Sequence, residues 1–344
     1  MQSDAAPKSI LIIRPSALGD VCRSVPVLVS LRGAFPGARI DWLVQDTFAD
    51  AVVGHPALSG VVPFERGRLG KDLKRIRPES TLEFLECLRA RRYEMVVDAQ
   101  GLFRSGMLAL ATGAPRRVGY ANAQELGWLG CNERHRVDRE VHAVDRMLAL
   151  VERAGVRPDA DMRLYSLPAW KQWAAQALGA SRAAVLAPTS RWAGKRWPAE
   201  RFAALAERML AMGMERVAIV GARSEREQCG PLLELASRDE RVLDLIGKTS
   251  VGELMAVVER AAVVVANDSA AIHMAVGFER PMVALYGPTS IARVGPYRRE
   301  RDVIQHVQPG EALDHKDDLA GRAMMERISV DEVAARVRSA LSGA

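Results

Sequence analysis

The segment that decides the fold is ILIIRPSALGDVCRSVP, residues 10–26. Its apolar run, Ile10 to Ile13, is short and rich in β-branched residues, and a loop containing proline and glycine follows at once. This pattern is typical of a central parallel strand, and we expect a helix to begin near Val21. In an open α/β sheet, ligands bind at the edge where such strands end. The turn between strand and helix is therefore a candidate site.

Asp20 lies on this turn, and its carboxylate has two interpretations. It can act as a general base, because a carboxylate at a strand end can accept the proton of a bound hydroxyl. It can equally be no more than a helix cap, since aspartate is a favoured N-cap residue. This segment alone leaves both interpretations open.

Length and composition restrict the class of protein. A chain of 344 residues predicts about two domains, and 49% hydrophobic residues with 5% aromatic residues indicates a globular protein. No stretch approaches the ~20 apolar residues of a membrane-spanning helix, and the N-terminal MQSDAAPK lacks the apolar core of a signal peptide, so we expect a cytoplasmic protein. The cysteines are scattered without CxxC spacing, which supports neither a disulfide framework nor a zinc site. We expect no metal.

The charge favours an acidic partner. A net charge of +6 and a pI near 9.3 suit nucleic acid, an anionic membrane or a phosphorylated substrate. Few aromatic residues and no nucleic-acid module argue against nucleic acid. One stretch is especially basic and is either a solvated charge run or an anion-binding loop. Its residues are Arg66, Arg68, Lys71, Lys74, Arg75 and Arg77.

Strand and helix patterns alternate along both halves of the chain, with a break near Pro158 and Pro168. This alternation predicts two doubly wound parallel sheets, in domains 1–165 and 166–344. The corner DAQGLFRS, residues 98–105, is expected to share a sheet edge with the Asp20 turn. The stretch 116–145 reads as a loop, and packing of the last helix, 329–341, back on the first domain stays open. Further strands are expected at 39–44, 61–64, 94–97, 183–187, 216–220, 242–245, 262–266 and 281–285.

Three loops of the second half follow strands. In PTSRWAGKRWP, residues 188–198, Thr189 and Ser190 supply hydroxyl and backbone donors, while Lys195 and Arg196 supply cations suited to phosphate oxygens. The alternative is a solvated loop whose tryptophans pack on their neighbours.

The second loop, VGARSEREQ, residues 220–228, allows two roles for its acidic residues. Ser224 and Glu227 have the spacing of a capping box. Glu225 can instead accept hydrogen bonds from ribose hydroxyls.

The third loop is ANDSAAIHMAVG, residues 266–277. The small residues Ser269, Ala270 and Ala271 leave the N–H groups of a helix start open to an anion, and Asp268 would lie beside it. His273 is either a ligand-binding residue or a packed structural histidine. YGPT, at 286–289, forms one more turn after a strand.

Taken together in order and spacing, these motifs resemble glycosyltransferase family 9, the heptosyltransferases. The motifs are SALGDV, DAQGLFRS, RRVGY, GKRWP, NDSAAIHMA and YGPT. The resemblance spans almost the whole chain, and DAQGL preceded by ARRYEMVV is more similar to heptosyltransferase I than to heptosyltransferase II. It implies the GT-B fold, with two Rossmann-like domains facing a central cleft.

The resemblance also implies an activity and roles for single residues. The activity is inverting, metal-independent transfer of heptose from ADP-L-glycero-D-manno-heptose to a Kdo residue of lipid A. Asp20 matches the catalytic base. The donor would be bound by Thr189, Ser190, Lys195, Glu225, Asp268, Ser269, Ala270, Ala271 and His273. The acceptor would contact Ser16, Gly19, Arg66, Arg68, Lys71, Gln100, Arg104 and Arg117.

No cofactor is implied, and the partners implied are the nucleotide sugar, an anionic glycolipid acceptor and, peripherally, the inner membrane. We expect a monomer that binds no nucleic acid. Three alternatives remain open: a family 9 enzyme with another nucleotide sugar or acceptor, including a heptosyltransferase II, a non-catalytic protein that binds nucleotide sugar or anionic lipid, and a nucleotide-binding regulator on nucleic acid.

Overall fold

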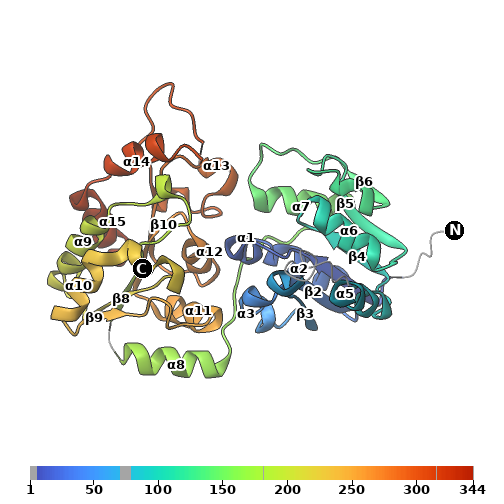
Figure 1. The fold of residues 1–344 in the computed structure, drawn as a ribbon, viewed down its shortest axis with the longest axis horizontal. Helices are drawn as coiled ribbons and strands as arrows, with labels where there is room; N and C mark the ends of the chain where they lie inside the picture. The colour runs from blue at the N-terminus through green and yellow to red at the C-terminus, as the bar shows by residue number, and fades with distance from the viewer. Residues whose placement is uncertain (1–5, 70–78, 181, 315, 344) are drawn as a thin grey trace. The chain divides into compact units, whose positions relative to one another are not determined.

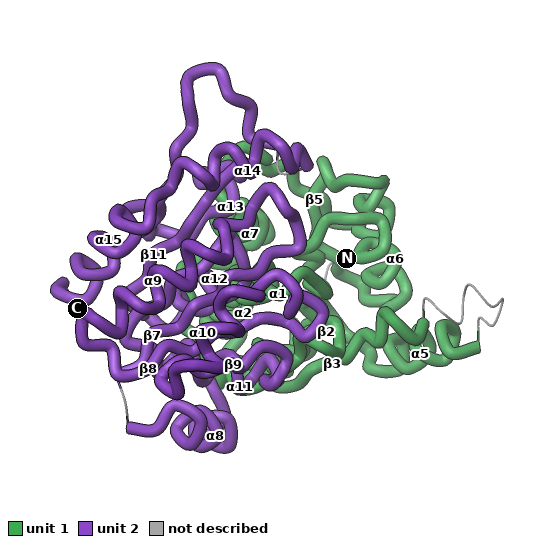
Figure 2. Tube along the Cα trace, turned by 60° about the vertical axis from the view of Figure 1, so that its left-hand side comes forward, with its two compact units in different colours: residues 1–165 green, residues 166–344 purple. Residues whose placement is uncertain are grey.

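The computed structural model describes residues 6–69, 79–180, 182–314 and 316–343. The chain forms two compact units, Met1–Tyr165 and Ser166–Ala344, which are the two ranges expected from the sequence (Figure 2).

The first unit is built on a parallel sheet that has six strands among its described residues, in the order β3-β2-β1-β4-β5-β6 (Figure 1). β1 (Ser9–Ile13) lies inside the sheet, paired with β2 and β4, and its residues Ile10 to Ile13 are fully buried. Strands covered on both faces read as continuous apolar runs, which is why this segment predicted a central strand. The other strands are β2 (Arg39–Gln45), β3 (Gly60–Phe64), β4 (Met95–Asp98), β5 (Arg116–Tyr120) and β6 (Glu133–His135).

Helical segments alternate with these strands. They are α1 (Leu18–Arg23), α2 (Val25–Ala34), η1 (Asp46–Phe48), α3 (Asp50–Val53), α5 (Glu79–Ala90), α6 (Phe103–Ala111), η2 (Gly127–Gly130) and α7 (Ala143–Arg153). In the register of the sheet Ile13 lies opposite Asp98, so the turn after β1 and the corner after β4 share one edge, as expected.

The second unit repeats this architecture, with strand order β12-β11-β10-β7-β8-β9 among the described residues. Its strands are β7 (Ala183–Ala187), β8 (Arg216–Ile219), β9 (Val242–Asp244), β10 (Val263–Asn267), β11 (Met282–Leu285) and β12 (Val303–Ile304). Its helical segments are α8 (Pro168–Leu178), η3 (Ala193–Lys195), α9 (Ala199–Ala211), η4 (Arg223–Cys229), α10 (Gly230–Arg238), α11 (Val251–Arg260), α12 (Ala270–Gly277), α13 (Ile291–Val294), η5 (Glu300–Asp302), α14 (Asp318–Glu326) and α15 (Val330–Ser342).

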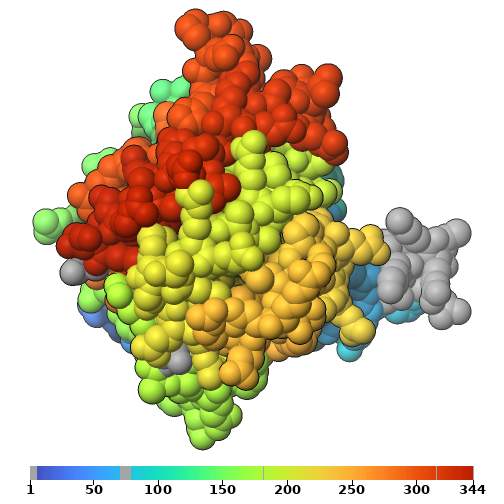
Figure 3. All heavy atoms as spheres, turned by 90° about the vertical axis from the view of Figure 1, so that its left-hand side faces the viewer, coloured from blue at the N-terminus to red at the C-terminus, as the bar shows by residue number. Residues whose placement is uncertain are grey.

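The last helix, α15, belongs to the core of its own unit. Val333, Ala334 and Val337 are buried in the cluster that also holds residues of α9, β10 and β11. Figure 3 shows the red atoms of the C-terminal helices beside the yellow-green atoms around α9. The apolar face of α15 is therefore used within the second unit.

Two expectations about the helices and strands of the first unit were wrong. The stretch 116–145, read as a loop, contains β5 and β6, because RRVGY places Val118 and Tyr120 in the core although its arginines made it look polar. The first helix begins at Leu18 and not near Val21, so the glycine of the turn is helical.

A tight contact between α6 and η2 fixes the segment that follows β5. A β-carbon at Gly106 would lie 2.0 Å from the Gly127 carbonyl oxygen, and one at Gly130 would lie 1.7 Å from the Gly106 oxygen. Only residues without a side chain permit this approach of two backbones.

Gly106→Ala is therefore expected to lower the free energy of unfolding by roughly 1–3 kcal/mol or more, because the overlap is with backbone that cannot rotate away. Gly33→Ala in α2 is the matched control, since a β-carbon there meets nothing within 4 Å. The control should leave stability unchanged or raise it slightly. Denaturant unfolding of both variants measures the difference, and equal midpoints would contradict this account.

Candidate active site

Asp20 is held at the start of α1 by its own backbone. α1 begins at Leu18, so Asp20 is its third residue, and its Oδ2 accepts a hydrogen bond of 3.2 Å from the Ala17 N–H. The interpretation of Asp20 as an N-cap residue is therefore wrong by position. Its carboxylate reaches back to the residue before the helix, which leaves Oδ1 for other partners.

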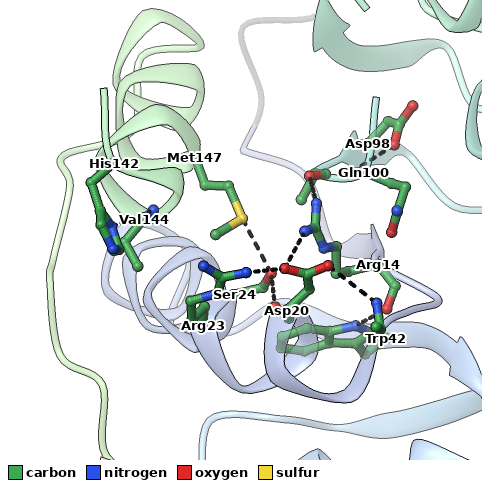
Figure 4. Close-up of polar contacts among 12 residues, drawn as sticks. Arg14, Asp20, Arg23, Ser24, Trp42, Asp98, Gln100, His142, Val144 and Met147 are labelled. Carbon is green, nitrogen blue, oxygen red and sulfur yellow. Dashed lines mark hydrogen bonds and ion pairs between the residues drawn. The ribbon is translucent and has the colours of Figure 1, made fainter. Parts of the chain in front are cut away.

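Two arginines meet the Asp20 carboxylate (Figure 4). Arg14 Nη2 lies 3.3 Å from Oδ1, and the Arg23 guanidinium donates to the same oxygen. Burial alone would raise the pKa of Asp20, but Arg14, Arg23 and the Ala17 N–H outweigh it and hold the pKa well below its usual range. The carboxylate is thus ionised at physiological pH, and its side chain is 27% exposed.

Arg14 also joins the two corners of the sheet edge. Its Nη1 donates to the Ala99 carbonyl at 2.6 Å, one residue beyond β4, while Nη2 faces Asp20 (Figure 4). Trp42 Nε1 donates to the Arg14 carbonyl at 3.4 Å. Asp20 is thereby tied through one side chain to the second strand-end corner.

The second corner is organised by Asp98. Its Oδ1 accepts from the Gln100 and Gly101 N–H groups, each at 3.0 Å, and Oδ2 accepts from the Ser105 hydroxyl at 2.9 Å. Burial raises the pKa of Asp98 to about 6, although these hydrogen bonds favour the charged form. Asp98 therefore fixes the backbone conformation of this corner. The Gln100 Oε1 beside it is a buried acceptor without a partner in the described part of the chain.

The residues expected at the acceptor fall into two groups. Ser16 and Gly19 lie on the Asp20 turn and are half-buried, and Arg104 is exposed near the start of α6. Arg66 and Arg68 are exposed just beyond the end of β3, where Arg68 pairs with Glu65 at 3.1 Å. Lys71, Lys74, Arg75 and Arg77 lie outside the described residues.

Arg117 does not lie at this edge. It is the second residue of β5 and pairs in register with Val96, whereas Asp98 ends the neighbouring strand. Its guanidinium donates to the Gly130 and Ala114 carbonyls. Arg117 therefore holds backbone segments together near the end of the sheet where the strands begin. We do not include it in the acceptor site proposed below.

In the second unit, the loops after β7 and β8 meet. The Thr189 hydroxyl donates to Glu225 Oε2 at 2.7 Å, and the Ala222 N–H donates to the same oxygen at 3.2 Å. The capping pair expected between Ser224 and Glu227 is wrong, because Glu225 makes that contact with the backbone before η4. Ser190 is buried beside this pair, and its N–H donates to Gln228 Oε1 at 3.2 Å.

The loops after β7, β10 and β11 meet at a second point. Lys195 Nζ lies 2.6 Å from Asp268 Oδ2, and the Thr289 hydroxyl donates to the same oxygen at 2.9 Å. A lysine already beside an aspartate presents its remaining N–H donors with their direction fixed. This arrangement can bind a phosphate oxygen next to Asp268.

The start of α12 supplies backbone donors. Ser269 is the N-cap residue, but its side chain caps nothing, and its Oγ is a buried atom without a hydrogen-bond partner among the described residues. The helix begins at Ala270, followed by Ala271, and a helix start with such small residues can bind an anion. His273 is only 4% exposed within α12, which fits its interpretation as a packed residue.

Sequence reasoning missed Arg14, Arg23, Thr289 and Gln228. Arg14 directly follows the buried strand, and Thr289 ends the YGPT turn, so position at a strand end was the available signal for both. Arg23 and Gln228 gave no such signal.

The described residues contain no group of three or more histidine, cysteine, aspartate or glutamate side chains placed to hold a metal ion. Within the same ranges, no helix has the length and apolar character needed to cross a membrane.

Fold and site together define a two-unit α/β protein with an ionised aspartate on a strand-end turn of the first unit and with lysine, hydroxyl and helix-start N–H donors after strands of the second, the pattern of a GT-B glycosyltransferase. The model of glycosyltransferase family 9 (heptosyltransferase) matches residues 81–321. The chain therefore belongs to glycosyltransferase family 9, which confirms the predicted family and enzyme class.

Individual relatives agree. The chain is 28% identical over 334 residues to lipopolysaccharide heptosyltransferase 1 of Escherichia coli K12, covering 93% of this chain and 99% of the relative. It is 25% identical over 350 residues to lipopolysaccharide heptosyltransferase 2 of the same strain, covering 93% and 97%. The solved E. coli heptosyltransferase WaaC with ADP-2-deoxy-2-fluoro heptose has a TM-score of 0.73 at 24% identity, covering 96% of this chain and 99% of that one. This likeness confirms the GT-B fold.

The raised pKa of Asp98 predicts a pH effect on stability. Between pH 3.8 and about 6 the unfolded chain releases the Asp98 proton while the folded protein keeps it, so this group stabilises the fold fully below that window and loses its contribution as pH rises through it. The difference in unfolding free energy between wild type and Asp98→Asn should fall by roughly 3 kcal/mol across the window.

Denaturant unfolding at several pH values measures this difference. Glu86→Gln, at an exposed position of α5, is the control and should track the wild type. A difference between wild type and Asp98→Asn that stays constant with pH would show that folding does not raise the pKa of Asp98.

Proposed function

We propose that this protein transfers heptose from ADP-L-glycero-D-manno-heptose to a Kdo residue of lipid A, with inversion and without a metal ion, in synthesis of the lipopolysaccharide inner core. The observation that carries the proposal is the fixed, ionised Asp20 carboxylate at a strand-end turn. The family membership and the relatives that are lipopolysaccharide heptosyltransferases support it. We further propose that the enzyme is a cytoplasmic monomer that works at the inner membrane without a cofactor.

In the proposed reaction, the acceptor hydroxyl oxygen forms a bond to the anomeric carbon of the heptose while the bond from that carbon to the ADP oxygen breaks on the opposite face. The hydroxyl proton passes to Asp20, and ADP leaves with the bonding electrons. A strongly ion-paired carboxylate is a weak base. It suits a transition state in which the acceptor hydroxyl becomes acidic as its oxygen bonds to the sugar.

The donor is assigned to the second unit. Lys195 and the first N–H groups of α12 would meet the diphosphate, and Glu225 would accept from ribose hydroxyls once Thr189 shares that carboxylate. Asp268 and Thr289 fix the direction of Lys195. These positive groups and the helix dipole would stabilise the leaving diphosphate in place of a metal ion.

The acceptor is assigned to the edge that carries Asp20. Ser16, Gly19 and Gln100 surround the turn and the neighbouring corner, and the unpartnered Gln100 Oε1 can accept from a sugar hydroxyl. Arg66, Arg68 and Arg104 would meet the anionic groups of the glycolipid.

Asp20→Asn is expected to lower kcat by about 100-fold or more, because the amide cannot accept the proton, while affinity for ADP stays unchanged. Release of ADP from ADP-heptose and Kdo-lipid A measures turnover, and calorimetric titration with ADP measures binding. A variant with nearly normal turnover would reduce Asp20 to a support of α1.

Lys195→Ala is expected to change ADP binding, which Asp20→Asn leaves unchanged. The affinity for ADP should fall by roughly tenfold or more, because a charge-assisted contact with phosphate is lost. Lys171→Ala on α8 is the matched control, because Lys171 pairs with Glu259 on the exposed surface and should leave binding unchanged. Unaltered ADP affinity in Lys195→Ala would remove this lysine from the donor site.

Acceptor and donor screens separate this proposal from its relatives. Kdo-lipid A is the acceptor expected of heptosyltransferase I, and an acceptor already carrying heptose would be expected of heptosyltransferase II. Consumption of a nucleotide sugar other than ADP-heptose would identify another family 9 activity. Binding without consumption of any nucleotide sugar would indicate a binding protein.

A further inference from the structure

An apolar surface lies on the first unit outside the Asp20 site. Among the described residues ten large apolar side chains are exposed, and four of them belong to α6 and η2 or the residue before η2. These four, which we call the α6–η2 patch, are Phe103, Leu110, Leu126 and Leu129. Single exposed apolar residues are ordinary, but a group of them marks an interaction surface.

The glycine contact between α6 and η2 brings together the two segments that carry this patch. Phe103, Gly106 and Leu110 have the i, i+3, i+7 spacing that places residues on one stripe of a helix. η2 packs directly on Gly106, between the other two positions. Leu126 precedes Gly127, which approaches the Leu102 backbone, and Leu129 precedes Gly130, which approaches Gly106. The two leucines therefore lie on the segment that packs against the stripe carrying Phe103 and Leu110.

Arginines lie in the segments that carry this apolar patch. Arg104 is exposed beside Phe103, and the Arg134 guanidinium lies 4.8 Å from the centre of the Trp128 ring within η2. Arg117 reaches the Gly130 carbonyl at the end of η2. The acids in the same segments are the exposed Glu125 and the half-buried Glu133, which pairs with Arg116 at 2.7 Å, so the positive charges outnumber them.

An apolar patch with exposed arginines in the same segments matches an anionic lipid bilayer. Acyl chains receive the apolar side chains, headgroup phosphates meet guanidiniums, and Trp128 has the amphipathic character of residues at the membrane interface. A partner protein would need acidic residues placed opposite these arginines. An anionic bilayer carries negative headgroups across its whole surface and needs no such match.

We propose that the α6–η2 patch docks the first unit on an anionic membrane surface by shallow insertion of Leu126 and Leu129. α6 begins at the corner that follows β4, which Arg14 ties to Asp20. Docking there would bring the Asp20 edge to the headgroups. That consequence rests on the proposed function, whereas the docking itself does not.

Vesicle flotation of the full chain tests the proposal. With phosphatidylcholine vesicles containing phosphatidylglycerol, Leu126→Asp combined with Leu129→Asp should reduce the bound fraction about tenfold or more. Leu319→Asp is the matched control, since this leucine of α14 is 83% exposed and lies in the second unit. The control should bind like the wild type, and vesicles of phosphatidylcholine alone should bind less.

A second variant keeps the test independent of damage to the fold. Leu126→Trp should retain binding, and its added fluorescence should shift to shorter wavelength with anionic vesicles but not without them. Unchanged flotation of the double aspartate variant, or no shift for Leu126→Trp, would overturn the docking. A concentration-dependent dimer in light scattering that Leu126→Asp abolishes would also overturn it and assign the patch to a second copy of the chain.

Turnover separates this inference from the proposed function. The double aspartate variant should lose activity on Kdo-lipid A in vesicles but keep it on a water-soluble, deacylated acceptor. Absence of turnover on both acceptors in the wild type would refute the proposed function and leave the flotation result standing.

Discussion

The Asp20 site depends on the position of one cation, Arg14. Its guanidinium spans the Asp20 carboxylate and the Ala99 carbonyl, so the turn after β1 and the corner after β4 share a polar link. Burying an arginine away from water costs several kcal/mol unless ion pairs and hydrogen bonds offset that cost. The adjacent β1 and β4 make this arrangement possible, because parallel strands end at one edge. The sheet thus sets the geometry, and Arg14 converts it into a fixed direction for the carboxylate.

This link gives the two acids of the edge opposite characters. Asp20 is ionised because two arginines and a backbone N–H surround it, whereas Asp98 is surrounded by backbone and a hydroxyl and holds its proton more readily. Environment, more than residue type, decides which of the two aspartates is ionised and which keeps its proton more readily. The same division appears in the second unit, where Asp268 positions Lys195.

Much of the fold was predictable because buried parallel strands are apolar along their whole length. Ile10–Ile13 and Val263–Val265 gave this signal directly. β5 was missed since Arg116 and Arg117 use their guanidiniums on Glu133 and on backbone carbonyls, contacts that no local pattern encodes. The position of the loops after β7, β8 and β10 was predictable because each follows a strand of the second unit. The Arg14 contact with Ala99 was not, because it joins residues far apart in the sequence, and the Glu225 contact was not, because it depends on where η4 begins.

The Ser269 hydroxyl carries a thermodynamic consequence. A serine at an N-cap position ordinarily contributes about 1 kcal/mol by binding the first turn of its helix, yet this one makes no such bond. Helix α12 therefore lacks that contribution to stability. The Ser269 hydroxyl and the N–H groups of the first turn remain available to a ligand. A ligand that bonds to this hydroxyl and these N–H groups would gain contacts that the folded protein leaves unused, and α12 is about 1 kcal/mol less stable without them than a capped helix would be.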